Sequence, residues 1–495
     1  MMRVEPRTTA VRRPGGRIFR GALWNYTAQA ATIFIQFGYA GVTSRHVPAA
    51  GFGIYAVSLA VVGFVTLLAT GGLGQTVNRL HQLDRPSVNG LQTYALVLGF
   101  AGAIFVLCTA GIWADLWGNP EAESTIRLLS MLALMAPSTA LATGVLRRKG
   151  LFRRLSFITI LANVVGMCLG VFAVLVEPSA RALIFSPVLA QLFLLVGSTL
   201  SDRSLLVGFA SLGKCKEALG FSQKLTVASV LSYVSSNLIK IGFSHAHGGS
   251  AFGAWNRAEV LALVPFQQSQ TAIIQAVYPE FRHDIHSSER AHRVWTDLLI
   301  LVSSFILPVS VLAAIILPRL TSVLFGAGWE TSERLVGFLA IAGGTQVVAV
   351  VLSSAVESLG RFRWIWSTEL LLIAFQTLGV VAVFHFSSIF IAPVVLIFTN
   401  VLRHTWQVWL CSNAGYVDAA ALSKHYFRVV AISLLVGIAA WVILWLPADD
   451  IPISMRWGIF SGAALCALWA GWKFRRHSSI FRIAESYGLL PASAK

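Results

Sequence analysis

Two cations lie inside apolar stretches that are long enough to cross a membrane. Lys240 falls in the stretch 225–243 and Arg257 in the stretch 252–279, and the short polar segment 244–250 joins the two. A charge at the centre of a membrane helix costs about 2.5–3.5 kcal/mol on insertion scales, so it usually faces a cavity or a partner. A guanidinium can hold a phosphate or diphosphate through two parallel hydrogen bonds. The pair therefore predicts a binding site for an anionic group.

Polar side chains recur at helical spacing around both cations and in the first apolar stretch. The three stripes are Ser229, Ser232, Ser236 and Lys240; Arg257, Gln268, Thr271 and Gln275; and Asn25, Gln29, Thr32 and Gln36. Residues three and four apart share one helix face, so we expect all three stripes to line one water-filled lumen. The alternative is that they bond to neighbouring helices, at about 0.6 kcal/mol each. Lys240 and Arg257 also lie near the predicted outer ends of their helices, from which long side chains can reach the interface.

Two acidic residues complete the candidate set. Glu369 lies inside the apolar stretch 366–384, where it can pair with a cation or carry a coupling proton. Glu357 has either the same role or belongs to the adjoining cytoplasmic junction with Arg361. The five Cys and eleven His form no C-x-x-C pair and no H-x-x-x-H face, so the sequence predicts no metal site and no cofactor. The coupling ion, a proton or sodium, is left open.

Composition predicts an all-α integral membrane protein. The chain has 495 residues, of which 56% are hydrophobic and 12% charged, against about 25% charged in soluble domains. A membrane helix needs about 20 apolar residues, and about 14 stretches meet that requirement. The predicted spans are 21–43, 52–73, 91–113, 125–146, 155–176, 182–200, 225–243, 252–279, 295–317, 335–355, 366–384, 389–411, 429–446 and 457–472.

The distribution of basic residues predicts the orientation. Most of the 38 Lys and Arg residues fall in the termini and in every second junction, which places those segments and both termini in the cytoplasm. Arg403, which interrupts the stretch 389–411, is assigned to this inner side. The net charge of +17 is then a property of cytoplasmic loops that meet anionic lipids, and no nucleic acid is needed to explain it. The stretch 21–43 is too long for a signal-peptide core, so it is predicted to be an uncleaved first helix.

An internal repeat predicts two halves. Gly51-Phe-Gly-Ile-Tyr55 opens the second helix, and Ala251-Phe-Gly-Ala-Trp255 opens the eighth. Each is the second helix of its half, which predicts two parallel six-helix lobes around a central cavity, followed by two extra helices. The predicted domains are 1–20 (basic cytoplasmic N-terminus), 21–200 (N-lobe), 201–224 (cytoplasmic linker), 225–411 (C-lobe), 412–472 (two further helices) and 473–495 (basic cytoplasmic tail).

Several motifs, taken in this order, resemble those of a known family. They are Gly21-Ala-Leu-Trp-Asn25, Gly51-Phe-Gly-Ile-Tyr55, Gly72-Leu-Gly74, Phe252-Gly-Ala-Trp-Asn-Arg-Ala258 with Pro265 and Val277-Tyr-Pro279, and Leu324-Phe-Gly-Ala-Gly-Trp329. The chain resembles the polysaccharide transporters of the multidrug/oligosaccharidyl-lipid/polysaccharide (MOP) exporter superfamily, and Arg257 matches their frequent aromatic-x-Arg-Ala pattern. Ile239 stands immediately before Lys240, at a position where members of this family often carry Asp.

The resemblance implies a MATE-like fold with a basic central cavity, in a bacterial inner-membrane flippase that is not an enzyme. Its substrate would be a lipid-linked oligosaccharide, carried on a polyprenyl diphosphate, which alternating access moves from the inner to the outer leaflet. Implied partners are membrane lipids and polysaccharide biosynthesis enzymes, with the protein itself a monomer. One alternative is a drug or metabolite exporter of the same fold. Another is a membrane polymerase or glycosyltransferase, although the short outer loops offer little acid or base for it. A third is a scaffold that transports nothing.

Overall fold

The computed structural model describes residues 32–70, 73, 77, 85–202, 205, 216–283, 288–445, 455 and 457–462, and for 216–228, 275–283 and 288–291 it describes the backbone alone. Every regular element in these ranges is a helix. The helices are residues 32–44, α2 (Ala49–Thr70), α4 (Arg85–Leu116), α5 (Ala122–Arg148), α6 (Phe152–Val176), α7 (Ala180–Leu200), α8 (Lys216–His283), α9 (Ser288–Phe325), α10 (Glu330–Ser358), α11 (Phe362–Phe386), α12 (Ile391–Asn413) and α13 (Ala419–Trp445).

The long apolar stretches become helices because a backbone in hydrocarbon must satisfy its own hydrogen bonds. Nine helices within the described ranges are long and apolar enough to cross a membrane. Large apolar side chains are exposed along them, such as Leu378 on α11 and Leu435 on α13, as lipid contact requires. The prediction of an all-α, multi-pass membrane protein is confirmed. The first and fourteenth predicted spans lie partly outside the described residues, so the number fourteen stays a prediction.

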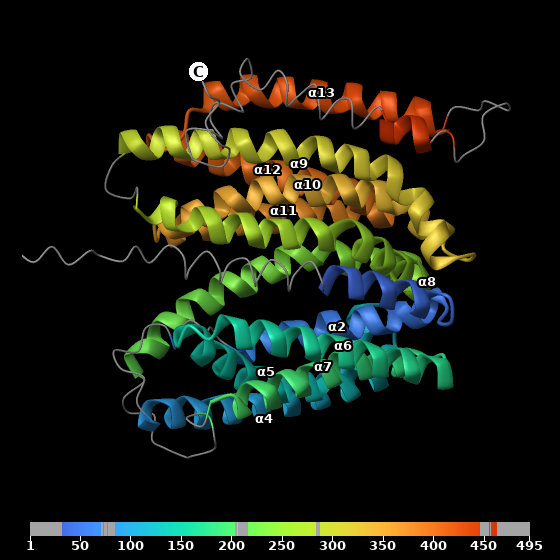
Figure 1. Cartoon of the computed structure of the whole chain (residues 1–495), viewed down its shortest axis with the longest axis vertical. Helices are drawn as coiled ribbons and strands as arrows, with labels where there is room; N and C mark the ends of the chain where they lie inside the picture. Colours follow the sequence, from blue (N-terminus) through green and yellow to red (C-terminus); the bar gives the residue numbers. More distant parts are fainter. Residues whose placement is uncertain are drawn as a thin grey trace, which may run out of the picture.

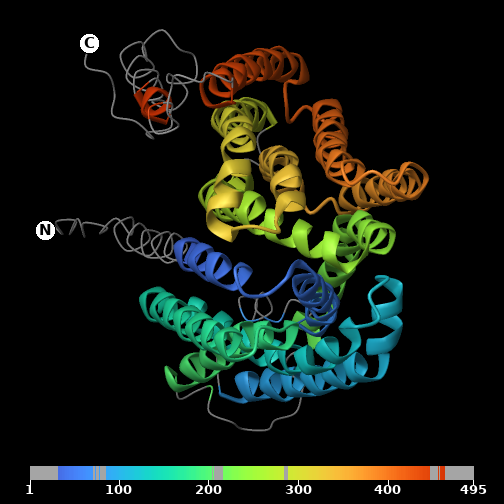
Figure 2. The ribbon, with the colours of Figure 1, turned by 90° about the vertical axis from the view of Figure 1, so that its right-hand side faces the viewer.

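The helices form two groups with α8 between them (Figure 1). In the first group α2 packs against α4, α5 and α7, and α6 packs against α7. In the second, α10 packs against α9 and α12, α11 against α12, and α13 against α9. α8 contacts α2 on one side and α10, α11 and α12 on the other. Figure 2 shows the same division after a quarter turn, with blue to green helices on one side and yellow to red ones on the other.

α8 is two antiparallel arms joined at Gly248. This residue has φ 81° and ψ 172°, while the helix runs on both sides of it. The sequence predicts a polar turn over 244–250, but the first arm continues to the residues just before Gly248. Lys240 and Arg257 therefore lie eight and nine residues from the break, about 12–14 Å along each arm. Both cations are more than two helical turns away from the end that the sequence predicts to be outer.

Gly248 should tolerate no side chain. Its backbone angles fall in a region that is almost confined to glycine, where other residues cost about 1–3 kcal/mol. We expect Gly248→Ala to lower the thermal stability of the purified protein, although open space surrounds the site of the added methyl group. The matched control is Gly63→Ala in α2, where the nearest atom would be 3.7 Å away and the backbone is helical. Equal melting temperatures for the two variants would contradict this explanation of the break.

The two repeats predicted from the sequence pack against each other. A methyl group built on Gly53 would lie 1.9 Å from the carbonyl oxygen of Gly249, and one built on Gly253 would lie 1.8 Å from that of Ala49. In the repeat, Gly53 corresponds to Gly253 and Ala49 corresponds to Gly249. The two contacts are therefore reciprocal, as across a two-fold axis. We call Ala49, Gly53, Gly249 and Gly253 the glycine seam. Only glycine at 53 and 253 lets the α2 and α8 backbones approach this closely.

Reciprocal aromatic contacts flank the glycine seam. Phe52 packs edge-on against Trp329 of the other group at 5.5 Å, and Phe252 packs against Trp117 at 5.4 Å. Hydrogen bonds join the same segments, although with opposite donors, because the Trp329 indole donates to the carbonyl of Ser44 (2.9 Å) and the Ser244 hydroxyl donates to that of Trp117 (2.8 Å). The two helix groups are therefore closed against each other at the Gly248 end.

Candidate functional site: a polar cavity and a buried arginine

A polar cavity of about 200 Å³ lies in the second helix group, between both arms of α8 and helices α10, α11 and α12. Its polar lining consists of Ser235, Ser236, Lys240, Glu259, Gln267, Gln346, Gln376, Thr399, Asn400 and Arg403. Ser235 and Gln376 are each 1% exposed and form its floor, while Ser236 and Gln267 are exposed at its rim. Charged and amide side chains of these membrane helices thus face a shared cavity instead of the lipid.

Lys240 projects into this cavity and forms an ion pair there. Its Nζ lies 2.5 Å from Oε1 of Glu259, on the other arm of α8, and the two side chains are 18% and 20% exposed. The pair explains how the charge of Lys240 is held inside the membrane. It also removes the alternative that Lys240 reaches out to the membrane interface.

A second ion pair joins α11 to α12. Arg403 Nη2 lies 3.3 Å from Oε2 of Glu369, with side chains 12% and 6% exposed, and Ser235 of α8 donates a hydrogen bond to the same oxygen. The sequence treats Arg403 as an interruption of the predicted span 389–411 and assigns it to the inner side. Arg403 stands in the middle of the unbroken helix α12, because its charge is neutralised by Glu369.

Arg257 is buried between the two helix groups, apart from the polar cavity. The residue is 4% exposed, its guanidinium lies over the ring of Phe52 at 4.1 Å, and it donates to Asn256 Oδ1 at 2.8 Å. No carboxylate among the described residues pairs with it, and its Nε is buried without a described partner. The Phe52 face supplies attraction of about 2 kcal/mol when desolvated, less than a full counter-ion would. Arg257 is thus a buried cation with spare hydrogen-bond donors.

The structure separates residues that the sequence grouped into one lumen. Lys240 and Ser236 line the polar cavity, whereas Arg257 lies against α2. Gln36 and Gln268 are half-buried, and Gln36 Oε1 has no described partner. Asn25 and Gln29, and the side chain of Gln275, lie outside the described residues. Glu357 is exposed near the end of α10, as expected for a residue of the adjoining junction.

Sequence reasoning missed several residues of the polar cavity. Glu259 stands two positions from Arg257 and therefore points to a different side of the helix, where it pairs with Lys240. Thr399, Asn400 and Arg403 form a polar stripe on α12, which the sequence analysis did not identify because it treated Arg403 as an interruption of that span. Ser235 and Gln267 stand one position away from the stripes that were predicted.

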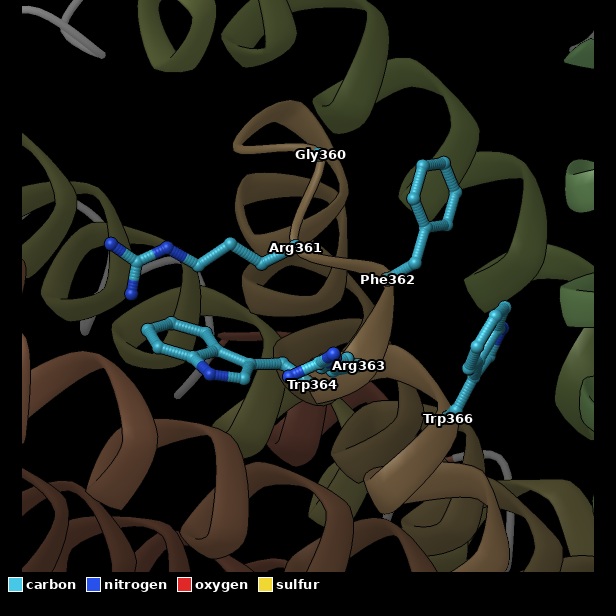
Figure 3. A pocket seen from close by; sticks show the side chains of 6 residues that line it. All are labelled: Gly360, Arg361, Phe362, Arg363, Trp364 and Trp366. Carbon is cyan, nitrogen blue, oxygen red and sulfur yellow. The ribbon is translucent and has the colours of Figure 1, made fainter.

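A second hollow, of about 460 Å³, lies at the connection from α10 to α11. Figure 3 shows Arg361 lying over Trp364, with Phe362 and Trp366 pointing away from them. The Arg361 guanidinium is 4.4 Å from the Trp364 ring centre. Basic and Trp side chains together are typical of a helix end held at the membrane interface, so we interpret this hollow as an anchor.

The chain is similar in sequence to a known protein family and to several of its characterised relatives. Residues 42–334 match the family model described as "Polysaccharide biosynthesis protein". The chain is 21% identical to the lipopolysaccharide biosynthesis protein WzxC of Escherichia coli (strain K12), over 69% of this chain and 70% of that protein. It is 23% identical to the succinoglycan biosynthesis transport protein ExoT of Rhizobium meliloti (strain 1021), over 66% of each.

Solved structures show the same fold. The lipid II flippase MurJ in an inward closed conformation superposes with a TM-score of 0.72 at 9% identity, over 92% of this chain and 99% of that one. An inward-facing MATE family transporter of the MOP superfamily gives 0.55 at 13% identity, over 81% and 96%. Family and fold together confirm the prediction of a membrane transporter rather than an enzyme. With more than half of its length matched by the family model, the chain belongs to the polysaccharide biosynthesis protein family, with the MOP-transporter fold.

Proposed function

We propose that the protein moves a lipid-linked oligosaccharide, carried on a polyprenyl diphosphate, from the inner to the outer leaflet by alternating access. The observation that carries this proposal is Arg257, a cation that is 4% exposed and has no described carboxylate partner. A buried, uncompensated guanidinium is costly unless an anionic ligand completes it, and its planar fork fits a diphosphate. The relatives WzxC and ExoT are named for polysaccharide biosynthesis, and MurJ for flipping a lipid.

The second arm of α8 presents exposed polar residues further along the same arm, about three to four turns beyond Arg257. Gln267 and Thr271, four residues apart on one face of this arm, are exposed, whereas the exposed residues of α13 are largely apolar. Exposed polar side chains such as the Gln267 amide are expensive in hydrocarbon, so this surface supports a water-filled path between the lobes, residues 21–200 and 225–411. The saccharide would follow the path while the acyl chains stay in the bilayer.

Arg257 is covered in this conformation, since the glycine seam holds α2 against α8 beside it. Direct binding of substrate therefore requires the two groups to separate, as alternating access does. With both termini cytoplasmic, the seam is the outer gate. The protein would act as a monomer in the bacterial inner membrane, next to the enzymes that assemble its substrate. Glu369 is the acid best placed to couple the cycle to a proton, because its carboxylate accepts a hydrogen bond from Ser235 of α8 and forms an ion pair with Arg403 of α12.

Arg257→Ala should lower polysaccharide export by at least tenfold, and Arg257→Lys should restore only part of it, because lysine keeps the charge but loses the two-point geometry. The measurement is surface polysaccharide in a strain that lacks the native gene and expresses each variant at equal membrane levels. A control is Arg127→Ala, whose exposed pair with Glu123 lies in the first turns of α5. Unchanged export by Arg257→Ala would remove Arg257 from the substrate site and leave the proposal without its main support.

A further inference from the structure

We propose that the polar cavity binds an uncharged sugar unit of the transported glycan, while Arg257 binds the anionic carrier. This inference rests on the proposed function and divides substrate recognition between two places. The cavity lies wholly within the second helix group, between α8, α10, α11 and α12, whereas Arg257 lies against α2 of the first.

The charges of the cavity select a neutral ligand. Lys240 is paired with Glu259, and Arg403 with Glu369, so each cation that lines the cavity already has its own carboxylate. A diphosphate would have to displace these carboxylates and leave them buried without a partner. A metal cation would lie beside an ammonium and a guanidinium, which repel it. Charge balance therefore favours a ligand without net charge.

The hydrogen-bonding groups select a ligand that both donates and accepts. Gln376 is 1% exposed and its Nε2 has no described hydrogen-bond partner. Arg403 Nε is also buried without a described partner. Both are donors that lack an acceptor. The Glu259 carboxylate and the Gln346 and Gln267 amides add acceptors around the same space. Sugar hydroxyls donate and accept at once, which matches this mixture of groups.

The size and entrance of the cavity fit one ring of a glycan. Its 200 Å³ would hold about seven waters at the volume of liquid water, which is the space of a single hexose. Ser236 and Gln267 are exposed at its rim, one on each arm of α8. Thr271, one turn further along α8 on the same face as Gln267, is also exposed, so a sugar in the proposed path can reach the cavity.

Saturation-transfer difference NMR tests this inference on the full chain, purified in a detergent without a sugar headgroup. The probes are glucose, galactose and N-acetylglucosamine, each alone at millimolar concentration, and inorganic pyrophosphate as the anionic probe. We expect at least one sugar to bind the wild-type protein. Gln346→Met and Gln376→Met should each weaken that binding about tenfold, because each removes hydrogen bonds at nearly constant volume.

The matched control is Gln407→Met, the same change at a glutamine that is 3% exposed on α12 and bonded to Ser353 outside the cavity lining. Gln376 also accepts from the backbone of Ile239, so Gln346, which makes no side-chain bond to a described residue, tests the cavity with less structural cost. Binding of no sugar, or sugar binding that survives both cavity variants, overturns the inference. So does pyrophosphate binding that depends on Gln346. If the wild-type chain restores export in cells and yet binds no sugar, only this inference fails; if it restores no export, the proposed function fails.

Discussion

Gly53→Ala and Gly253→Ala are each expected to reduce polysaccharide export by tenfold or more. The added methyl group would lie 1.9 Å or 1.8 Å from a backbone oxygen, far inside the distance at which carbon and oxygen touch. The obstacle is backbone, so no rotation of a side chain relieves it, and α2 and α8 must move apart. Overpacking of this kind costs about 1–3 kcal/mol, and 1.4 kcal/mol already changes a conformational equilibrium tenfold. The substitutions therefore disfavour the state in which the glycine seam is closed.

Two measurements separate a gate that is held open from a protein that fails to fold. Export is scored in cells at equal membrane levels, and Ala49→Cys reports the seam through its reaction with a membrane-impermeant maleimide added from outside. Labelling should be slow in the otherwise wild-type seam and at least tenfold faster with Gly253→Ala. Gly63→Ala is the control, since it adds the same methyl group to the same helix α2 where the nearest atom is 3.7 Å away.

Normal export by both seam variants, with unchanged labelling at position 49, would show that the α2–α8 contact is not part of the transport cycle. Loss of export together with loss of the folded protein would assign the glycines to stability alone. Faster labelling with lost export is the result that a gate predicts.

The repeat that forms the glycine seam could be read from the sequence, and for a physical reason. Gly51-Phe-Gly-Ile-Tyr55 and Ala251-Phe-Gly-Ala-Trp255 repeat the same small and aromatic residues at the same place in each half. A repeat that must pack against its own copy needs glycine where the two backbones meet and large rings beside them. Trp329, in another motif that was recognised, packs against Phe52. Local pattern thus predicted the two halves, although not that the repeats touch each other.

The depth of Lys240 in the membrane could not be predicted from the sequence, because it depends on where the first arm of α8 ends. The segment 244–250 contains two His, two Gly and two Ser, which favours a loop, yet tertiary packing keeps all but Gly248 helical. Ser244 is completely buried and donates to Trp117, and Phe243 packs against Trp255 at 4.8 Å. These long-range contacts extend the first arm of α8, and no local propensity reports them.

The pairing of charges was also beyond the sequence. Lys240 and Glu259 are separated by the Gly248 break, and Glu369 and Arg403 lie on different helices, so helical spacing links neither pair. Without its acid, Arg403 looked like an interruption of the predicted span 389–411. Residue periodicity predicts which face of a helix is polar. Which faces meet follows from how the helices are arranged around α8.

Removal of either partner of the Arg403–Glu369 pair should destabilise the protein by about 3 kcal/mol, whereas removal of both should cost far less. The side chains are 12% and 6% exposed, so Glu369→Leu would leave a buried guanidinium without its counter-ion, and Arg403→Met would leave a buried carboxylate held only by Ser235. A single buried charge costs about 3–5 kcal/mol, while an apolar pair of similar volume is nearly neutral. The value expected here is at the low end, because the adjoining cavity admits some water.

Thermal unfolding of the purified single and double variants measures this coupling as a double-mutant cycle. The exposed pair Arg127–Glu123, with side chains 56% and 42% exposed, is the control: although its atoms are 2.6 Å apart, Arg127→Met should change stability by less than about 1 kcal/mol. Additive losses in Arg403→Met and Glu369→Leu would mean that the two charges are solvated separately. The polar cavity would then be an open aqueous vestibule, in which balanced charge selects nothing. Strong coupling instead means that the cavity presents a neutral surface of fixed donors and acceptors, which is the condition for recognising an uncharged sugar.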